Sequence, residues 1–404
     1  MATLGMIPIA DRQSVFDSGA AFLCAQRCTV SEIVCLDSGA EVEVRSGNPY
    51  VVVRIRGGVD PTEAFNRAHE AAQEALDRLA ILGKAALSVR NASDEHVVWW
   101  REDSEQVLRV VGTSTVALTV EGSCVLRDKD GNRVESPTPP KLIYNESLRY
   151  FRLSQVTEDL FDAFRNMYLA FELLLEDHCP KHARGEGESV WLQRALSDVS
   201  KAAPLSKAYK AIGLDIVADI YHDLYLNIRC RLFHAKHGSR LVPQNLADRR
   251  LVSEGLDKLT SVFALLAEKL LNARRPSGAM TYEGFAWMTE PLMSGSTVLV
   301  SGNDMPLDSS ATLKSPAFVG AVPMLTRAAP ELSRPGLRAV LGSVAATDLR
   351  RLQKIARFGF AHDGRLIMSG AVGADLTHDG MDRIEAQMCM QFRNATAPKE
   401  FFQS

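Results

Sequence analysis

Residues 227–237 read Asn227-Ile-Arg229-Cys-Arg231-Leu-Phe-His234-Ala-Lys236-His237, and they close a predicted amphipathic helix that begins near Leu214. Up to Arg240 the segment holds four Lys or Arg and two His but no Asp or Glu, whereas the whole chain has a formal net charge of -3. The inward positions of the helix are Ile216, Ile220, Leu224 and Ile228. A basic segment on a slightly acidic protein indicates a phosphate-bearing partner.

The sequence on both sides of this stretch keeps a helical period, from about Ser147 to Ala273. A first predicted helix precedes a second that Ser189 can cap, and a fourth follows Pro243. The apolar positions of the first and fourth helices are Val156, Leu160, Phe164, Met167, Phe171 and Leu174, and Val252, Leu256, Leu259, Phe263, Leu266 and Leu270. Alternating steps of four and three are typical of bundle helices. The sequence therefore predicts an α-helical bundle over residues 141–275.

Residues 1–140 are predicted to form an N-terminal α+β domain. Its one clear helix has Asp60 as N-cap, Pro61 as first residue and Gly83 at its end. β-prone runs surround this helix, at Cys28–Cys35, Glu41–Arg45, Tyr50–Ile55, His96–Trp100, Val107–Val111, Ser114–Val120 and Cys124–Leu126. The proline-rich stretch Ser136–Pro140 marks the first domain boundary.

Residues 276–404 are predicted to form a small β-rich C-terminal domain, after a second boundary at Arg274–Gly278. Predicted strands cover Ser296–Val300, Arg357–Phe360 and Leu366–Met368, whereas Met381–Phe392 fits either a strand or a helix. The predicted fold class is thus an α+β multidomain chain. In it, a central α-helical bundle is flanked by an N-terminal α+β domain and a small β-rich C-terminal domain.

Composition is that of a soluble globular protein, with 46% hydrophobic and 24% charged residues. The N-terminus does not resemble a signal peptide, and no apolar run is long enough to cross a bilayer, so a cytoplasmic protein without a membrane partner is expected. The seven cysteines form no C-x-x-C pair and are expected to be free thiols. The sequence has no H-E-x-x-H motif or aspartate cluster, so neither a metal nor another cofactor is expected.

The pair Arg229 and His234 matches a known chemical need. Metal-independent RNA cleavage requires a group that takes a proton from the ribose 2′-hydroxyl and a cation that stabilises the pentavalent phosphorane. Histidine suits the proton transfer near neutral pH, and the planar guanidinium of arginine suits the phosphoryl oxygens. On an ideal helix the two side chains diverge, so the helix must end before His234 if they are to converge. The same spacing recurs at Arg357 and His362, which shows that spacing alone is a weak signal.

Three segments together resemble the HEPN superfamily, and more narrowly the MauJ-type methylamine-utilisation accessory proteins. They are Phe164-Arg-Asn-Met-Tyr-Leu-Ala-Phe-Glu172, Gly187-Glu188-Ser-Val-Trp191-Leu-Gln-Arg-Ala-Leu196 and Arg229-Cys-Arg-Leu-Phe-His234-Ala-Lys236. The resemblance implies a HEPN-like four-helix bundle and a homodimer with a composite cleft. It also implies a metal-independent endoribonuclease, as in a toxin or defence effector, with Arg229 and His234 as the catalytic pair. Cys230 stands where the frequent form of the motif has Asn.

Four further residues have supporting roles in this hypothesis. Glu172 would hold Arg229 or orient His234, Arg231 and Lys236 would contact flanking phosphates, and His237 would assist proton transfer. The flanking domains would sense a trigger or bind a protein partner. The alternative is a non-catalytic interaction or accessory protein that uses a HEPN fold for dimerisation or nucleotide binding, with Arg229 as an ion-pair anchor for Glu172.

Overall fold

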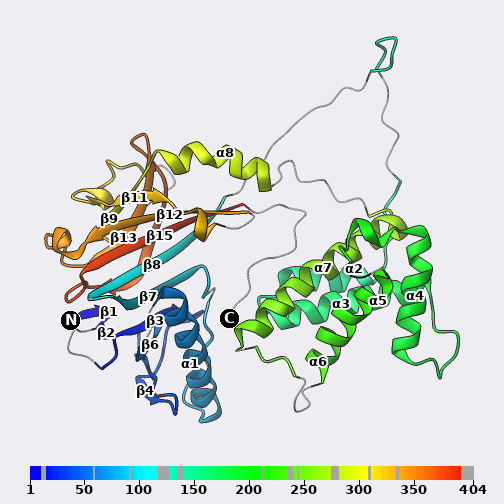
Figure 1. The fold of residues 1–404 in the computed structure, drawn as a ribbon, viewed down its shortest axis with the longest axis horizontal. Coiled ribbons are helices and arrows are strands. Elements are labelled where there is room, and N and C mark those ends of the chain that lie inside the picture. The colour runs from blue at the N-terminus through cyan, green and yellow to red at the C-terminus, as the bar shows by residue number, and fades with distance from the viewer. Residues whose placement is uncertain are drawn as a thin grey trace. The chain divides into compact units, whose positions relative to one another are not determined.

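The computed structural model describes residues 1–10, 15–57, 60–90, 92–116, 127–133, 140–211, 213, 215–234, 240–243, 245–273, 282–307, 311–333 and 336–392. The chain forms two compact units (Figure 1). One, called the sheet unit, combines Met1–Leu118 with Met280–Asn394, and the other, called the helical unit, spans Thr119–Ala279. The predicted boundary residues 136–139 and 274–278 lie outside the described residues.

Two large sheets dominate the described part of the sheet unit. The nine-stranded sheet has the order β11 (Leu325–Ala328), β12 (Leu337–Ala345), β15 (Arg383–Phe392), β8 (Glu105–Val116), β7 (Glu95–Glu102), β3 (Ser18–Leu23), β6 (Tyr50–Ile55), β5 (Glu41–Val44) and β4 (Glu32–Cys35). The six-stranded sheet has the order β10 (Val322–Pro323), β9 (Ser296–Ser301), β13 (Ile355–His362), β14 (Arg365–Leu376), β1 (Ala2–Leu4) and β2 (Ile7–Ala10). Within the larger sheet, β15 pairs with β8 in parallel.

The core of the sheet unit forms in two layers because strand residues alternate between the faces of a sheet. Val52, Trp99 and Leu108 of the nine-stranded sheet share one core with Phe358 and Phe360 of the six-stranded sheet. The opposite face of the nine-stranded sheet is covered by helix α1 (Pro61–Ile81). Its alanines allow a close approach to the strands, and they are Ala64, Ala68, Ala71, Ala72 and Ala75.

Helix α1 begins and ends as its sequence predicts. The Asp60 side chain accepts hydrogen bonds from the backbone N–H groups of Thr62 and Glu63. Pro61 occupies the first turn, and Gly83 follows the helix with a φ of 67°. Another helix, α8 (Tyr282–Ser294), contacts β11 and β12, and its Phe285 stacks on Phe392 with ring centroids 5.2 Å apart.

The predicted fold class is wrong, because the chain segments on either side of the helical unit do not form separate domains. β15 pairs with β8 over Arg383–Phe392, and β14 pairs with β1 at Leu376 and Leu4. Strands from both segments therefore build both sheets, and sheets rather than a central bundle dominate this mixed α/β structure. Such pairing depends on residues far apart in the chain, so neither segment reveals it locally.

The ambiguous segment before the C-terminus is a strand. β15 is buried on both faces along almost its whole length, as Ile384, Ala386, Met388 and Cys389 illustrate. A strand covered on both faces reads as a continuous apolar run rather than as an alternating one. Its apolar residues therefore also match helical spacing by coincidence.

The helical unit has its own apolar core. Its helices are α2 (Ser147–Val156), α3 (Leu160–His178), α4 (Glu188–Ala202), α5 (Ile216–Ile220), the π-helical η2 (Tyr221–Arg229), α6 (Cys230–Phe233) and α7 (Leu246–Leu271). Short 3₁₀ turns are η1 (Leu205–Lys207) here and η3 (Pro316–Phe318), η4 (Pro330–Leu332) and η5 (Ala346–Leu349) in the sheet unit. No helix among the described residues has both the length and the apolarity that crossing a bilayer requires.

The first helix predicted from the sequence is in fact two helices. α2 ends at Val156, and the Asp159 side chain caps α3 by accepting from the backbone N–H of Asp162. The capping aspartate gives the backbone hydrogen-bond partners that compete with continuation of the helix. The helical spacing of apolar residues continues across the break, so the spacing alone does not reveal it. The fourth predicted helix is α7, which Asn245 caps and which ends at Asn272 with a φ of 58°.

Candidate functional site

The predicted site lies at the end of a composite helix. α5, η2 and α6 follow one another without interruption from Ile216 to Phe233. The N–H of Cys230 bonds to the carbonyl of Tyr225, five residues earlier, which is the π-helical pattern. π-helical segments are rare overall, but those that occur often lie at functional sites. The helix ends at Phe233, and His234 has an extended backbone, with a φ of -127° and a ψ of 96°.

The guanidinium of Arg229 is enclosed by an acidic side chain and aromatic rings. Its Nη2 lies 2.7 Å from Oε1 of Glu188, at the start of α4. The rings of Tyr168, Tyr225 and Phe233 lie with their centroids 5.8, 5.4 and 5.1 Å from the guanidinium carbon. Only 15% of the Arg229 side chain is exposed. A weakly hydrated, planar cation suits such an aromatic enclosure.

The charges in this enclosure perturb one another. Burial, and then the Glu188 carboxylate, raise the pKa of Glu172, which the Arg229 charge partly offsets. Burial, followed by the carboxylate of Glu188, raises the pKa of Tyr225 to about 12. Burial opposes the charge of Arg229, but the nearby Glu188, Tyr168 and Glu172 outweigh it, so the pKa of Arg229 is raised. Arg229 therefore stays charged at any physiological pH.

Glu172 belongs to the same cluster, but it is not the ion-pair partner of Arg229. The partner is Glu188, whereas Glu172 interacts with Arg229 and Glu188 through their charges. The prediction that Arg229 forms an ion pair with Glu172 is therefore wrong. Glu188 occupies the first turn of its helix, where the helix dipole favours a carboxylate.

His234 lies apart from this enclosure. Its side chain is exposed, immediately beyond the last helical residue. No hydrogen bond or ion pair of the described residues involves His234, while its neighbour Phe233 faces Tyr168, with ring centroids 6.3 Å apart. The structure thus brings Arg229 together with Glu188 and Glu172, and leaves the imidazole at the surface.

Of the remaining predicted site residues, one forms an ion pair and two lie outside the described residues. Arg231 is half-buried, with its Nη2 3.9 Å from Oδ1 of Asp248, and it donates a long hydrogen bond to the carbonyl of Asn227. Lys236 and His237 lie outside the described residues. The described residues contain no group of three or more His, Cys, Asp or Glu arranged to hold a metal ion.

Sequence reasoning missed Glu188, Tyr168 and Tyr225 as members of the site. Two of the rings had a readable signal, because Tyr225 and Phe233 lie four residues before and after Arg229, on the same side of a helix. Glu188 and Tyr168 had no such local signal. They come from other helices, so only their packing against Arg229 reveals them.

No protein-family model, curated protein or solved structure matches this chain.

Proposed function

We propose that this chain is a non-catalytic interaction protein, in which Arg229 and Glu188 join the composite helix to α4 instead of serving a reaction. The observation that carries the proposal is the enclosure of Arg229 by Glu188 and three aromatic rings. Because only 15% of that side chain is exposed, the arginine has the environment of a structural anchor.

A catalytic role would require a different arrangement. A phosphate must reach the guanidinium, yet the Glu188 carboxylate already occupies it and repels an incoming anion. The imidazole would also have to face the same phosphate, whereas His234 is exposed and only 15% of the Arg229 side chain is exposed. Both features favour the non-catalytic alternative over the endoribonuclease.

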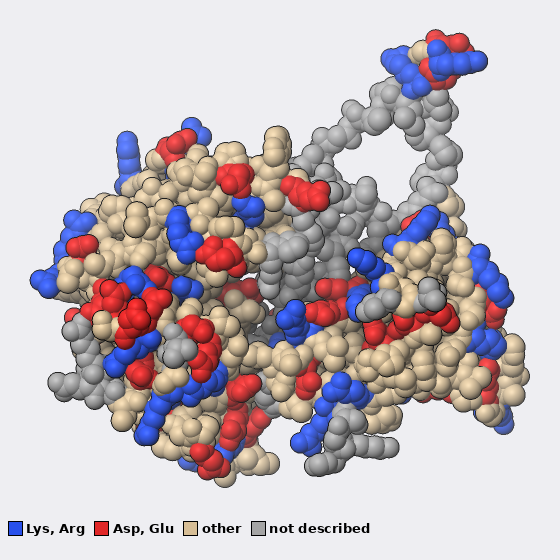
Figure 2. Space-filling model, viewed as in Figure 1, with Lys and Arg blue, Asp and Glu red and all other residues tan. Residues whose placement is uncertain are grey.

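Two further observations agree with an interaction role. On the face drawn in Figure 2, basic and acidic side chains of the described residues lie interspersed over both units. Among the described residues, that face has no broad area of positive charge of the kind that attracts nucleic acid. The resemblance of residues 164–236 to the HEPN superfamily implies a homodimer, and the resemblance to methylamine-utilisation accessory proteins implies a protein partner.

The test is incubation of the purified full chain with structured RNA in EDTA, together with a light-scattering measurement of its mass. We expect intact RNA and the mass of a dimer. Cleavage that leaves 2′,3′-cyclic phosphate ends, and that is lost in His234→Ala but kept in His182→Ala, would overturn the proposal and favour the ribonuclease. His182 is the matched control, because it is an exposed histidine of the same unit.

A further inference from the structure

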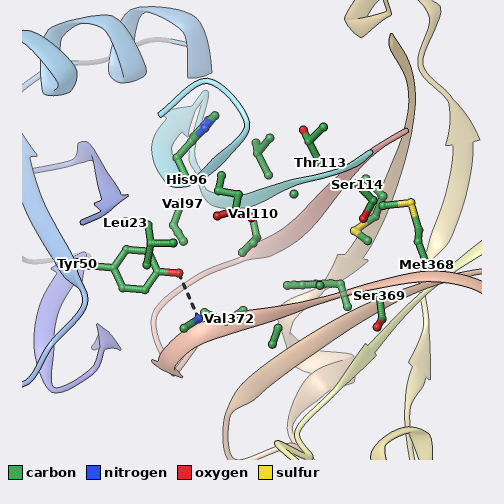
Figure 3. Close-up of a pocket in the computed structure, with 18 residues that line it drawn as sticks. Leu23, Tyr50, His96, Val97, Val110, Thr113, Ser114, Met368, Ser369 and Val372 are labelled. Carbon is green, nitrogen blue, oxygen red and sulfur yellow. Dashed lines mark hydrogen bonds between the residues drawn. The ribbon is translucent and has the colours of Figure 1, made fainter. Parts of the chain in front are cut away.

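A cavity of 170 Å³ lies between the two sheets of the sheet unit (Figure 3). Its walls come from both sheets. Leu23, Tyr50 and Val110 line it from the nine-stranded sheet, and Phe358 and Met368 line it from the six-stranded sheet. Apolar side chains make up the larger part of the walls, and Glu95, His96, Thr113, Ser114 and Ser369 add polar groups. Such a mixture is typical of a site that holds a small molecule.

The cavity exists because glycines replace side chains on both walls. Gly112 alternates with Val110 and Ser114 along β8, and Gly370 alternates with Met368 and Val372 along β14. A Cβ atom added at Gly112 or at Gly370 would meet no other atom within 4 Å.

Other strand glycines of the same unit are packed tightly instead. An added Cβ would lie 2.7 Å from Cβ of Val298 at Gly342, and 2.5 Å from the Phe318 ring at Gly359. Glycine is needed at those positions for close packing. At Gly112 and Gly370, which are partly exposed, it leaves open space between the two sheets.

Tyr50 supplies a directed polar group to this space. Figure 3 shows its ring pointing across the cavity towards β14, where its hydroxyl oxygen accepts a hydrogen bond from the N–H of Gly373 at 3.2 Å. Among the described residues, no acceptor takes the proton of that hydroxyl. Burial raises the pKa of Tyr50, so the hydroxyl keeps its proton at neutral pH and remains a donor.

The same cavity disfavours a charged anion. Glu95 lines it, and its carboxylate would repel an anionic ligand. An uncharged, largely apolar molecule with one acceptor fits these walls.

We infer that this cavity is a binding site for a small uncharged aromatic or alicyclic carbonyl compound of roughly six to ten non-hydrogen atoms. Its ring occupies the space left by Gly112 and Gly370, and its carbonyl oxygen accepts the proton of the Tyr50 hydroxyl. The site lies wholly in the sheet unit, so it is independent of the function proposed for the helical unit.

The test uses two probes of equal shape, acetophenone and α-methylstyrene, in which a methylene group replaces the carbonyl oxygen. Ligand-observed NMR titration of the full chain measures both dissociation constants. We expect acetophenone to bind with a Kd on the order of 1 mM, because so small a molecule can form few contacts. α-Methylstyrene should bind about 3- to 10-fold more weakly, because it cannot accept the hydrogen bond.

Variants separate the hydrogen bond from the cavity. Tyr50→Phe should reduce acetophenone binding to the level of α-methylstyrene, and Tyr144→Phe, at a tyrosine 67% exposed, should change nothing. Gly112→Leu and Gly370→Val fill the cavity from opposite walls, and each should abolish binding of both probes while the Tm stays equal or rises. Absence of binding to the wild type, equal affinity for the two probes, or undiminished binding in a folded filled variant would overturn the inference.

Discussion

Arg229 and Glu188 lie on different helices of the helical unit, and their Nη2 and Oε1 atoms are 2.7 Å apart. The pair is joined to the core by aromatic rings, since Tyr168 and Phe233 both contact the guanidinium. Arg229 is thus a contact point for α3, α4 and the composite helix at once. Removal of the Arg229 side chain should therefore lower the stability of the whole helical unit.

The first prediction concerns that stability. Arg229→Met should lower the free energy of unfolding by about 1–3 kcal/mol, because it removes the aromatic contacts and leaves the partly buried Glu188 carboxylate without its cation. Urea unfolding followed by circular dichroism at 222 nm measures the loss. Lys201→Met is the matched control at an exposed ion pair of α4, where the change should be much smaller. Equal losses in the two variants would mean that Arg229 is not an anchor.

The second prediction concerns pH. The pKa of Glu172 is raised above its ordinary value of 4.5, chiefly by burial and then by Glu188. In the pH range between the unfolded and folded pKa values, the folded state binds more protons, so stability falls as pH rises through this range. Glu172→Gln removes the penalty and should raise the Tm at pH 7. The gain should disappear well below pH 4.5.

Thermal unfolding across a pH series measures this difference. Glu254→Gln is the control, because Glu254 is an exposed carboxylate on another helix of the same unit, α7. If Glu172→Gln destabilises the protein at pH 7, then Glu172 stabilises Arg229 more than its own burial disfavours its charge.

The third prediction tests the packing of α7 on the composite helix. A Cβ added at Gly255 would lie 2.1 Å from Cδ1 of Ile228, which is buried. Gly255→Ala should therefore lower the free energy of unfolding by about 1–3 kcal/mol through overpacking, despite the better helix propensity of alanine. In an Ile228→Val background the clashing atom is absent, and the same substitution should be neutral or stabilising by up to about 1 kcal/mol.

A double-mutant cycle followed by urea unfolding measures this coupling. Additive effects of Gly255→Ala and Ile228→Val would show that the helices can move apart at no cost. They would then not be packed as closely as the structure indicates.

The fourth prediction concerns the ion pair that links the two chain segments of the sheet unit. Arg109 of β8 and Glu385 of β15 approach to 2.7 Å, with 13% and 7% of their side chains exposed. Arg109→Met should lower the free energy of unfolding by about 1–3 kcal/mol, since among the described residues Glu385 keeps only Arg383, at 3.2 Å. Removing both charges, in Arg109→Met with Glu385→Met, should recover part of the loss.

Near-UV circular dichroism reports on this region through Trp100, over which the Arg109 guanidinium lies 5.0 Å from the ring centroid. The exposed Arg365→Met is the control and should be nearly neutral. A loss in the double variant equal to that in Arg109→Met would assign the effect to lost packing rather than to an unpaired carboxylate.

Several local elements could be predicted from the sequence, although β3, β12 and the break between α2 and α3 were not among them. Asp60 and Pro61 mark the start of α1, and β6 has the predicted bounds Tyr50–Ile55. Such features depend on backbone capping and on periods of two or 3.6 residues, which a short stretch of chain contains in full. The end of the composite helix before His234 was readable in the same way.

The fold class and the surroundings of Arg229 became apparent only from the folded chain as a whole. The pairing of β15 with β8 and the approach of Glu188 both join residues that are distant in sequence. The open space opposite Gly112 likewise depends on what a second sheet leaves unfilled. Pairing, charge complementarity and cavities are properties of two surfaces together, so the sequence of one surface does not reveal them.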